Sequence, residues 1–158
     1  MEFKVSELIE MAINMEREGV EFYMILSKYA KSDETRKIFE DFAEDERKHE
    51  KFFRKMIEHY NIPAEETVED KDIEKLIRQI THHSVFPEVK PEKIEDFHPL
   101  NAVKMGIKTE KNTVRFYKRL LKKIKDDTGR DALIHLIGEE ESHMKKLTDM
   151  HKTMAFDF

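Results

Sequence analysis

Two short segments of the sequence combine residue types that could bind a metal ion. Glu46 and His49 are three positions apart in the run Glu46-Arg47-Lys48-His49, and Glu140 and His143 repeat this spacing. Residues three apart in a helix project from one face. A carboxylate and an imidazole on the same face are suitable ligands for a divalent cation. The two segments are therefore candidate halves of a metal site.

Both pairs lie in line with apolar residues at helical spacing. The apolar positions around the two pairs are Phe39, Phe42, Ala43, Phe53 and Ile57, and Leu133, Leu136, Ile137, Leu147 and Met150. This phase predicts that the four polar side chains point into the protein core. Burying a charged carboxylate is costly unless a cation or a set of hydrogen bonds compensates for it.

An internal repeat relates the two pairs. Shifting the chain by 94 residues places Glu16 on Glu110, Glu46 on Glu140 and His49 on His143. In both halves the first glutamate precedes the glutamate of the pair by 30 residues. Each half therefore predicts a helical hairpin that carries one glutamate on its first helix and the pair on its second.

Start and stop signals place the helices. The first helix is expected from Ser6, as its N-cap, to residues 29–31, and the second from residues 32–34 to about Tyr60. The third is expected after His98, and the fourth from Asp126 or Asp127. Residues 63–98 are expected to form a long crossover with one short amphipathic helix around residues 73–80. The prediction is an all-α four-helix bundle built from two hairpins, as a single domain spanning residues 1–158.

Composition excludes several other classes of protein. The chain has 158 residues, a charged fraction of 40 % with both signs interspersed and a net charge of −5, which disfavours a nucleic-acid surface. No apolar run is long enough to span a membrane, so a cytoplasmic protein is expected. Because there is no cysteine, disulfides, thiolate-bound zinc and iron–sulfur centres are excluded within these residues.

The pseudo-two-fold arrangement predicts one site at the middle of the bundle. Its candidate ligands are Glu16, Glu46, His49, Glu110, Glu140 and His143. Four carboxylates carry a formal charge of −4 when the imidazoles are neutral, and two divalent cations cancel this charge. Oxygen and imidazole ligands without thiolate suit iron or manganese. The alternative, that these are surface residues of a charge-rich bundle, is disfavoured by their alignment with the apolar positions.

The sequence resembles the rubrerythrin branch of the ferritin-like superfamily. The resemblance covers the whole chain and is strongest at residues 15–23 (MEREGVEFY) and 45–49 (DERKH). It implies a ferritin-like bundle in which the six residues above bind two iron ions, with manganese as the alternative. It also implies that Tyr23 and Tyr117 lie near the metals as candidate catalytic residues, although ordinary core tyrosines are an equal alternative. A homodimer is implied by the resemblance and favoured by the apolar tail at residues 153–158.

The resemblance also implies a function, from which two features of the chain depart. The implied function is a di-iron oxidoreductase that reduces peroxide or dioxygen. Without cysteine the chain lacks the rubredoxin module of full-length rubrerythrins, so electrons are expected from an external donor protein. Thr113 occupies the position where the family's peroxidases carry an extra glutamate, which weakens the step to peroxidase activity. The alternatives are an iron-binding protein with a ferroxidase or storage role, and a structural bundle whose site is vestigial.

Other polar residues receive weaker predictions. Asp45 and Glu139 precede the two motif glutamates and could orient a ligating histidine, but solvent exposure is the favoured interpretation. His135 falls off the apolar face of its helix and is expected at the surface. His82 and His83 are interpreted as part of a polar loop.

Overall fold

The structure is a computed structural model that describes residues 2–60, 62–81 and 99–153. The five helices and two strands of these residues are β1 (Glu2–Lys4), α1 (Val5–Tyr29), α2 (Asp33–His59), β2 (Thr67–Glu69), α3 (Lys71–Thr81), α4 (Pro99–Leu121) and α5 (Asp127–Thr153). None of the described helices has the length and apolar character needed to span a membrane. His82, His83 and the segment 154–158 lie outside the described residues.

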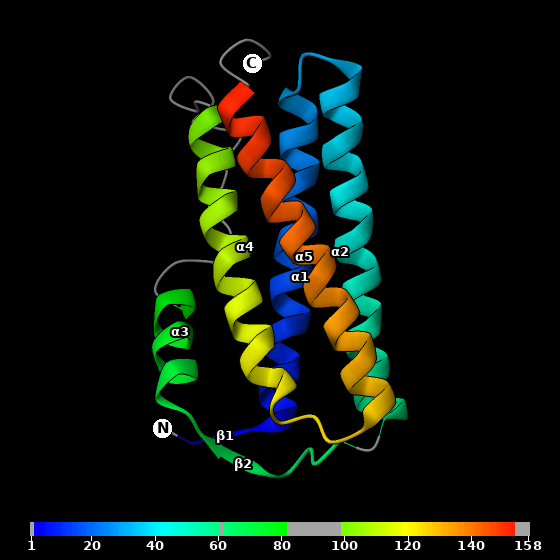
Figure 1. The fold of residues 1–158 in the computed structure, drawn as a ribbon, viewed down its shortest axis with the longest axis vertical. Coiled ribbons are helices and arrows are strands. Elements are labelled where there is room, and N and C mark those ends of the chain that lie inside the picture. The colour runs from blue at the N-terminus through cyan, green and yellow to red at the C-terminus, as the bar shows by residue number, and fades with distance from the viewer. Residues whose placement is uncertain (1, 61, 82–98, 154–158) are drawn as a thin grey trace.

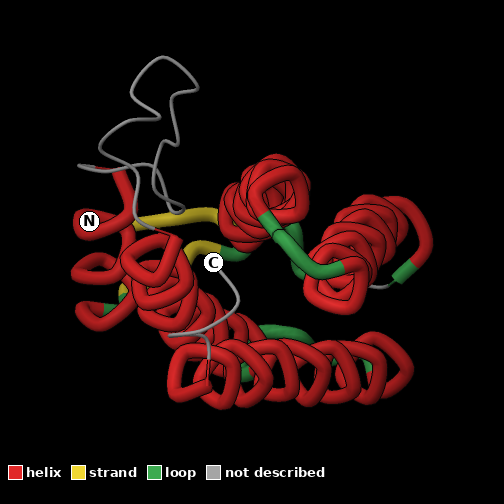
Figure 2. Tube along the Cα trace, turned by 90° about the horizontal axis from the view of Figure 1, so that it is seen from above, coloured by secondary structure: helices red, strands yellow, loops and turns green. Residues whose placement is uncertain are grey.

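The four long helices form the predicted bundle. Figure 1 shows α1, α2, α4 and α5 side by side, with α5 inclined to the others and α3 against the outside of α4. In Figure 2, which views the bundle from above, α3 and the strands lie to one side of α1 and α2. The predicted all-α fold, two hairpins joined by a crossover that carries one short helix, is confirmed.

The second helix of each hairpin begins with a side-chain cap. The Ser32 hydroxyl accepts a hydrogen bond from the Thr35 backbone N–H at 3.1 Å, and the Asp126 carboxylate accepts one from Gly129 N–H at 2.7 Å. Each cap satisfies a backbone donor that the first turn of a helix leaves unpaired. Both caps lie at the predicted helix starts.

Three details differ from the sequence prediction. The first helix begins at Val5 rather than after a Ser6 cap, and Lys4 N–H donates to the Glu7 carboxylate at 2.8 Å. The strands β1 and β2 pair antiparallel, with Phe3 opposite Val68. The sequence did not predict these strands, because three residues are too few to show an alternation of apolar and polar side chains and because the two strands are far apart in the sequence. Ile57 is 43 % exposed because Met56 occupies the inward position of that helical turn.

The core consists of two apolar clusters separated by a polar belt. One cluster joins the start of α1 to the ends of α2 and α4 and the start of α5, and the other joins the opposite ends of these helices. Along α1 the first cluster ends at Met15 and the second begins at Phe22, while along α2 the second cluster ends at Ala43 and the first resumes at Phe53. Between the clusters lie buried charged residues, and these define the candidate site.

Candidate metal centre

The structure brings all six predicted ligand residues into this belt. Every one is buried, with 1–3 % of its surface exposed, and they come from all four long helices, namely Glu16, Glu46, His49, Glu110, Glu140 and His143. One turn of helix separates the glutamate and histidine within each pair, which places both side chains against the facing helices. The placement follows the helical phase of the apolar residues around them.

The two motif glutamates lie between the two imidazoles. His49 Nδ1 is 2.9 Å from Glu46 Oε2 and 3.0 Å from Glu140 Oε1. His143 Nδ1 is 3.3 Å from Glu46 Oε1 and 3.2 Å from Glu140 Oε2. Each of these carboxylates thus presents one oxygen to one imidazole and the other oxygen to its counterpart.

The candidate ligand atoms form two overlapping groups. The first group is Glu16, Glu46, His49 and Glu140, and in the second Glu110 and His143 join the same Glu46 and Glu140. Within each group the ligand atoms all lie within 4.8 Å of one another. Glu46 and Glu140 belong to both groups. This pattern suits two metal ions bridged by two carboxylates, with one further glutamate and one histidine for each ion.

Tyr23 and Tyr117 contact the remaining two glutamates across the bundle. The Tyr23 hydroxyl on α1 donates to Glu110 on α4, and the Tyr117 hydroxyl on α4 donates to Glu16 on α1. Burial, followed by the neighbouring glutamate charge, raises the pKa of both phenols well above the usual 10.0. The tyrosines therefore remain protonated hydrogen-bond donors that hold the glutamates from outside the cluster.

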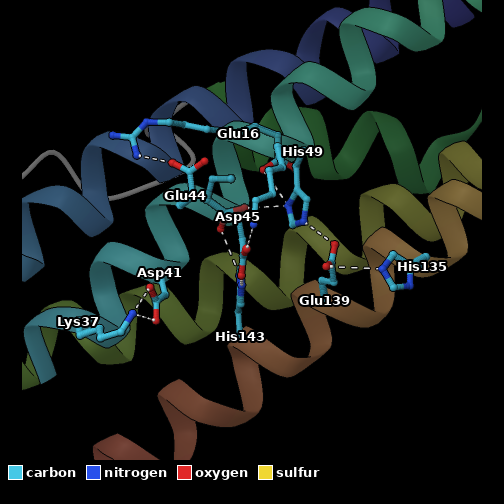
Figure 3. Close-up of polar contacts among 12 residues, drawn as sticks. Glu16, Lys37, Asp41, Glu44, Asp45, His49, His135, Glu139 and His143 are labelled. Atoms are coloured by element: carbon cyan, nitrogen blue, oxygen red, sulfur yellow. Dashed lines mark hydrogen bonds and ion pairs between the residues drawn. The ribbon is translucent and has the colours of Figure 1, made fainter. Parts of the chain in front are cut away.

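Asp45 and Glu139 contact the outer nitrogens of the two histidines. His143 Nε2 is 3.2 Å from Asp45 Oδ2, and His49 Nε2 is 3.0 Å from Glu139 Oε2 (Figure 3). The favoured interpretation of these two acids as solvated residues holds only in part, because their side chains are 33 % and 41 % exposed and each nevertheless contacts a histidine of the opposite hairpin. His135 is 80 % exposed, as predicted, and lies 3.6 Å from the same Glu139.

These outer carboxylates determine which nitrogen faces the cluster. A carboxylate accepts a hydrogen bond, so it favours a proton on Nε2 and directs Nδ1 of each ring at the motif glutamates. The hydrogen bond to His143 is also the largest cause that lowers the pKa of Asp45 to about 2. An anionic partner behind an imidazole is the usual arrangement for a histidine that binds a metal.

Without a metal, the belt balances its charge with protons. Burial raises the pKa of Glu16 and Glu110 well above the usual 4.5, and the charges of Glu140 and Glu46 raise it further. Burial opposes ionisation of Glu46 as well, but the adjacent imidazoles of His143 and His49 outweigh it and lower the pKa of Glu46 to about 2. The surrounding carboxylates outweigh burial and raise the pKa of His143 to about 12, and that of His49 rises likewise.

Several ligand atoms lack a hydrogen bond, which tests whether a metal fits the site. Among the described residues, the buried atoms without a hydrogen-bond partner include Glu46 Oε1, Glu140 Oε2 and His143 Nδ1. All three belong to residues of the second group of candidate ligands, and His143 Nδ1 lies within 3.3 Å of both oxygens. Buried polar atoms normally have partners. A cation bound between them would satisfy all three, so these residues fit a metal.

A four-helix bundle with this belt of carboxylates and imidazoles defines the class of ferritin-like di-iron carboxylate proteins. The family model described as Rubrerythrin matches residues 7–151, so the chain belongs to the rubrerythrin family. No curated protein sequence matches the chain. The chain is similar to a solved structure of a candidate ferritin-like diiron-carboxylate protein from Thermotoga maritima, with 26 % identity and a TM-score of 0.76. The similarity covers 96 % of this chain and 97 % of that one.

Asp45→Asn is expected to weaken metal binding without removing a ligand. The amide keeps the shape of the side chain but loses the charge that polarises His143, so metal affinity should fall by about 10- to 100-fold. Competition with a chelator of known affinity measures the change. Asp41→Asn is the matched control, because Asp41 is exposed and pairs with Lys37. Equal affinities for the two variants would show that Asp45 does not support the site.

Proposed function

We propose that this protein is a non-haem di-iron oxidoreductase that reduces hydrogen peroxide, or dioxygen, with electrons from an external donor protein. The observation that carries the proposal is the pair of overlapping ligand groups that share Glu46 and Glu140. A single metal would need only one group, and a structural ion pair would not leave buried carboxylate and imidazole atoms without hydrogen bonds.

The ligand assignment follows from the two groups. Glu16 and His49 would complete one metal position, Glu110 and His143 the other, and Glu46 and Glu140 would bridge them. Two divalent cations would cancel the charge of the four carboxylates once the belt has released its protons. Iron is the proposed metal because the chain belongs to the rubrerythrin family, and manganese is the alternative that the same ligands would accept.

Reduction of hydrogen peroxide to two water molecules consumes two electrons and two protons, and a pair of ferrous ions supplies the two electrons when bound. Tyr23 and Tyr117 hold protons at phenolic oxygens that contact Glu110 and Glu16. Asp45 and Glu139 keep the imidazoles oriented. The two apolar clusters exclude water from both ends of the belt. These residues include no cysteine that could bind an iron–sulfur centre, so the proposal takes the electrons from a donor outside them.

Anaerobic loading with Fe(II) tests the proposal. We expect two iron ions per chain, rapid oxidation by one hydrogen peroxide per iron pair, and repeated turnover when a reductant is added. Stopped-flow absorbance and an iron assay after gel filtration measure these quantities. Faster oxidation by air than by peroxide would favour dioxygen as the oxidant.

Two outcomes would contradict the proposal. Retention of many more than two iron ions per chain, without turnover of peroxide, would indicate a ferroxidase or storage role. Failure to bind either iron or manganese would exclude both functions and favour a vestigial site. Glu44→Ala serves as a control for surface carboxylates, because Glu44 is exposed and pairs with Arg47.

A further inference from the structure

Thr113 carries a buried hydroxyl that the proposed ligand set does not use. Its side chain is 3 % exposed, and among the described residues its Oγ1 has no hydrogen-bond partner. A buried hydroxyl without a partner destabilises a protein, since it gives up its hydrogen bonds to water. Such a group in a native core points to a ligand that would bind there.

Two other helical threonines in the bundle, Thr109 and Thr148, bond to their own backbone. Thr109 Oγ1 donates to the Met105 carbonyl at 2.9 Å, and Thr148 Oγ1 donates to the Met144 carbonyl at 2.7 Å. These bonds to the preceding turn are the ordinary solution for a threonine in a helix. Thr113 lies one turn after Thr109 on α4 but makes no such bond. Its hydroxyl is therefore free to donate into the interior.

The position of Thr113 on α4 places it beside the candidate metal centre. Glu110 lies three residues before it and Tyr117 four residues after it, and both take part in the belt contacts. Residues at these spacings share one helical face. The hydroxyl thus lies on the face that presents Glu110 and Tyr117 to α1.

The internal repeat shows that the two halves differ at this point. The residue 94 positions before Thr113 is Gly19 on α1, which is buried and has no side chain. One half of the belt therefore offers a hydroxyl where the other half offers only backbone. The asymmetry favours one location for a small bound molecule over its pseudo-symmetric equivalent.

We infer that the Thr113 hydroxyl donates a hydrogen bond to a small anion bound at the metal centre. The anion would bind through an oxygen or nitrogen atom, as hydroperoxide or azide does. The inference rests on the proposed di-iron function, because such an anion needs the metals to attract it into a belt of carboxylates. Thr113 thereby determines on which side of the centre the ligand binds.

The test compares Thr113→Val, Thr113→Ser and Thr109→Val with the wild type. Valine keeps the shape of threonine and removes the hydroxyl, serine retains the donor, and Thr109→Val removes a hydroxyl that already has a partner. The first readout is the azide Kd of the iron-loaded, oxidised protein, from the azide-to-iron absorption band. The second is the urea midpoint of the metal-free protein.

We expect Thr113→Val to raise the azide Kd about three- to tenfold, the effect of one hydrogen bond, with two iron ions still bound. Thr113→Ser and Thr109→Val should bind azide like the wild type. The urea midpoint should stay the same or rise in Thr113→Val and should fall in Thr109→Val.

Wild-type azide affinity in Thr113→Val would overturn the inference and leave the proposed function intact. A urea midpoint that falls as far in Thr113→Val as in Thr109→Val would also overturn it, because the hydroxyl would then have a protein partner. A wild-type protein that binds no iron would overturn the proposed function and the inference together.

Discussion

Glu46→Ala is expected to leave the protein without either metal ion, whereas Glu16→Ala is expected to leave one. Glu46 belongs to both groups of candidate ligands, and its two oxygens lie 2.9 Å from Nδ1 of His49 and 3.3 Å from Nδ1 of His143. Glu16 belongs to the first group alone. Loss of Glu46 therefore removes a ligand from each metal position, together with the carboxylate that would separate two cations of like charge.

The measurement is the metal content of protein loaded anaerobically with Fe(II) and separated from free metal. Glu44→Ala should retain both ions, since Glu44 is an exposed residue of the same helix. Glu140→Ala should behave like Glu46→Ala, because Glu140 occupies the equivalent place in both groups. If Glu46→Ala retained one tightly bound ion, the carboxylate would serve one metal only and the bridging assignment would be wrong.

The location of the belt residues was predictable from the sequence because each lies in phase with local apolar residues. Glu46 and His49 are flanked by Phe42 and Phe53 at helical spacing, so their burial follows from the burial of these aromatic residues. The 94-residue repeat then placed the second pair opposite the first. Local periodicity and duplication together specify which side chains enter the belt, and the geometry of a four-helix bundle makes them meet.

Contacts between the two hairpins carried no comparable local signal. Asp45 is adjacent to a buried position and is partly exposed, and its partner His143 lies 98 residues away on α5. The crossing angle of α2 and α5 determines which acidic residue contacts which histidine. The periodicity of apolar residues does not define this angle. The repeat does contain a usable signal, since the shift of 94 residues aligns Asp45 with Glu139 and both are acidic.

The sequence pattern likewise did not predict that the Thr113 hydroxyl would lack a hydrogen-bond partner. Its burial follows from its place between Glu110 and Tyr117, but a threonine in a helix usually bonds to the preceding turn, as Thr109 does. The choice between these two states depends on the side-chain rotamer, which the surrounding core determines. Sequence patterns therefore identify the ligands better than they identify the groups that adjust them.

The metal-free protein is expected to lose stability as pH rises from about 5 to about 8, while the metal-loaded protein gains stability over the same range. Burial and the charges of Glu140 and Glu46 raise the pKa of Glu16 and Glu110, so the native state binds protons that the unfolded state releases. The stabilisation is complete below the usual carboxyl pKa near 4.5 and is lost as pH rises towards the folded-state values.

The histidines act in the same direction. The carboxylates around His143 outweigh its burial and raise its pKa to about 12, so its contribution is complete below the usual value near 6.5 and declines as pH rises above it. Glu46 and Asp45 have the opposite sign, because their pKa values are lowered to about 2 and their stabilisation is lost only in stronger acid. The stabilisation by Glu46 and Asp45 is therefore lost only below the pH range over which the two forms are compared.

Metal binding reverses the trend because the ligands must release their protons first. Glu16, Glu110, His49 and His143 hold protons in the metal-free belt, so binding of two ions should release up to four of them and strengthen as pH rises. Thermal unfolding midpoints with EDTA and with anaerobic Fe(II) give the two curves, and calorimetry in buffers of different ionisation enthalpy counts the protons. Glu16→Gln should flatten the metal-free curve, because it removes one of the protonated groups and keeps an acceptor for Tyr117. Parallel curves for the metal-free and metal-loaded protein would show that protons do not balance the charge of the belt.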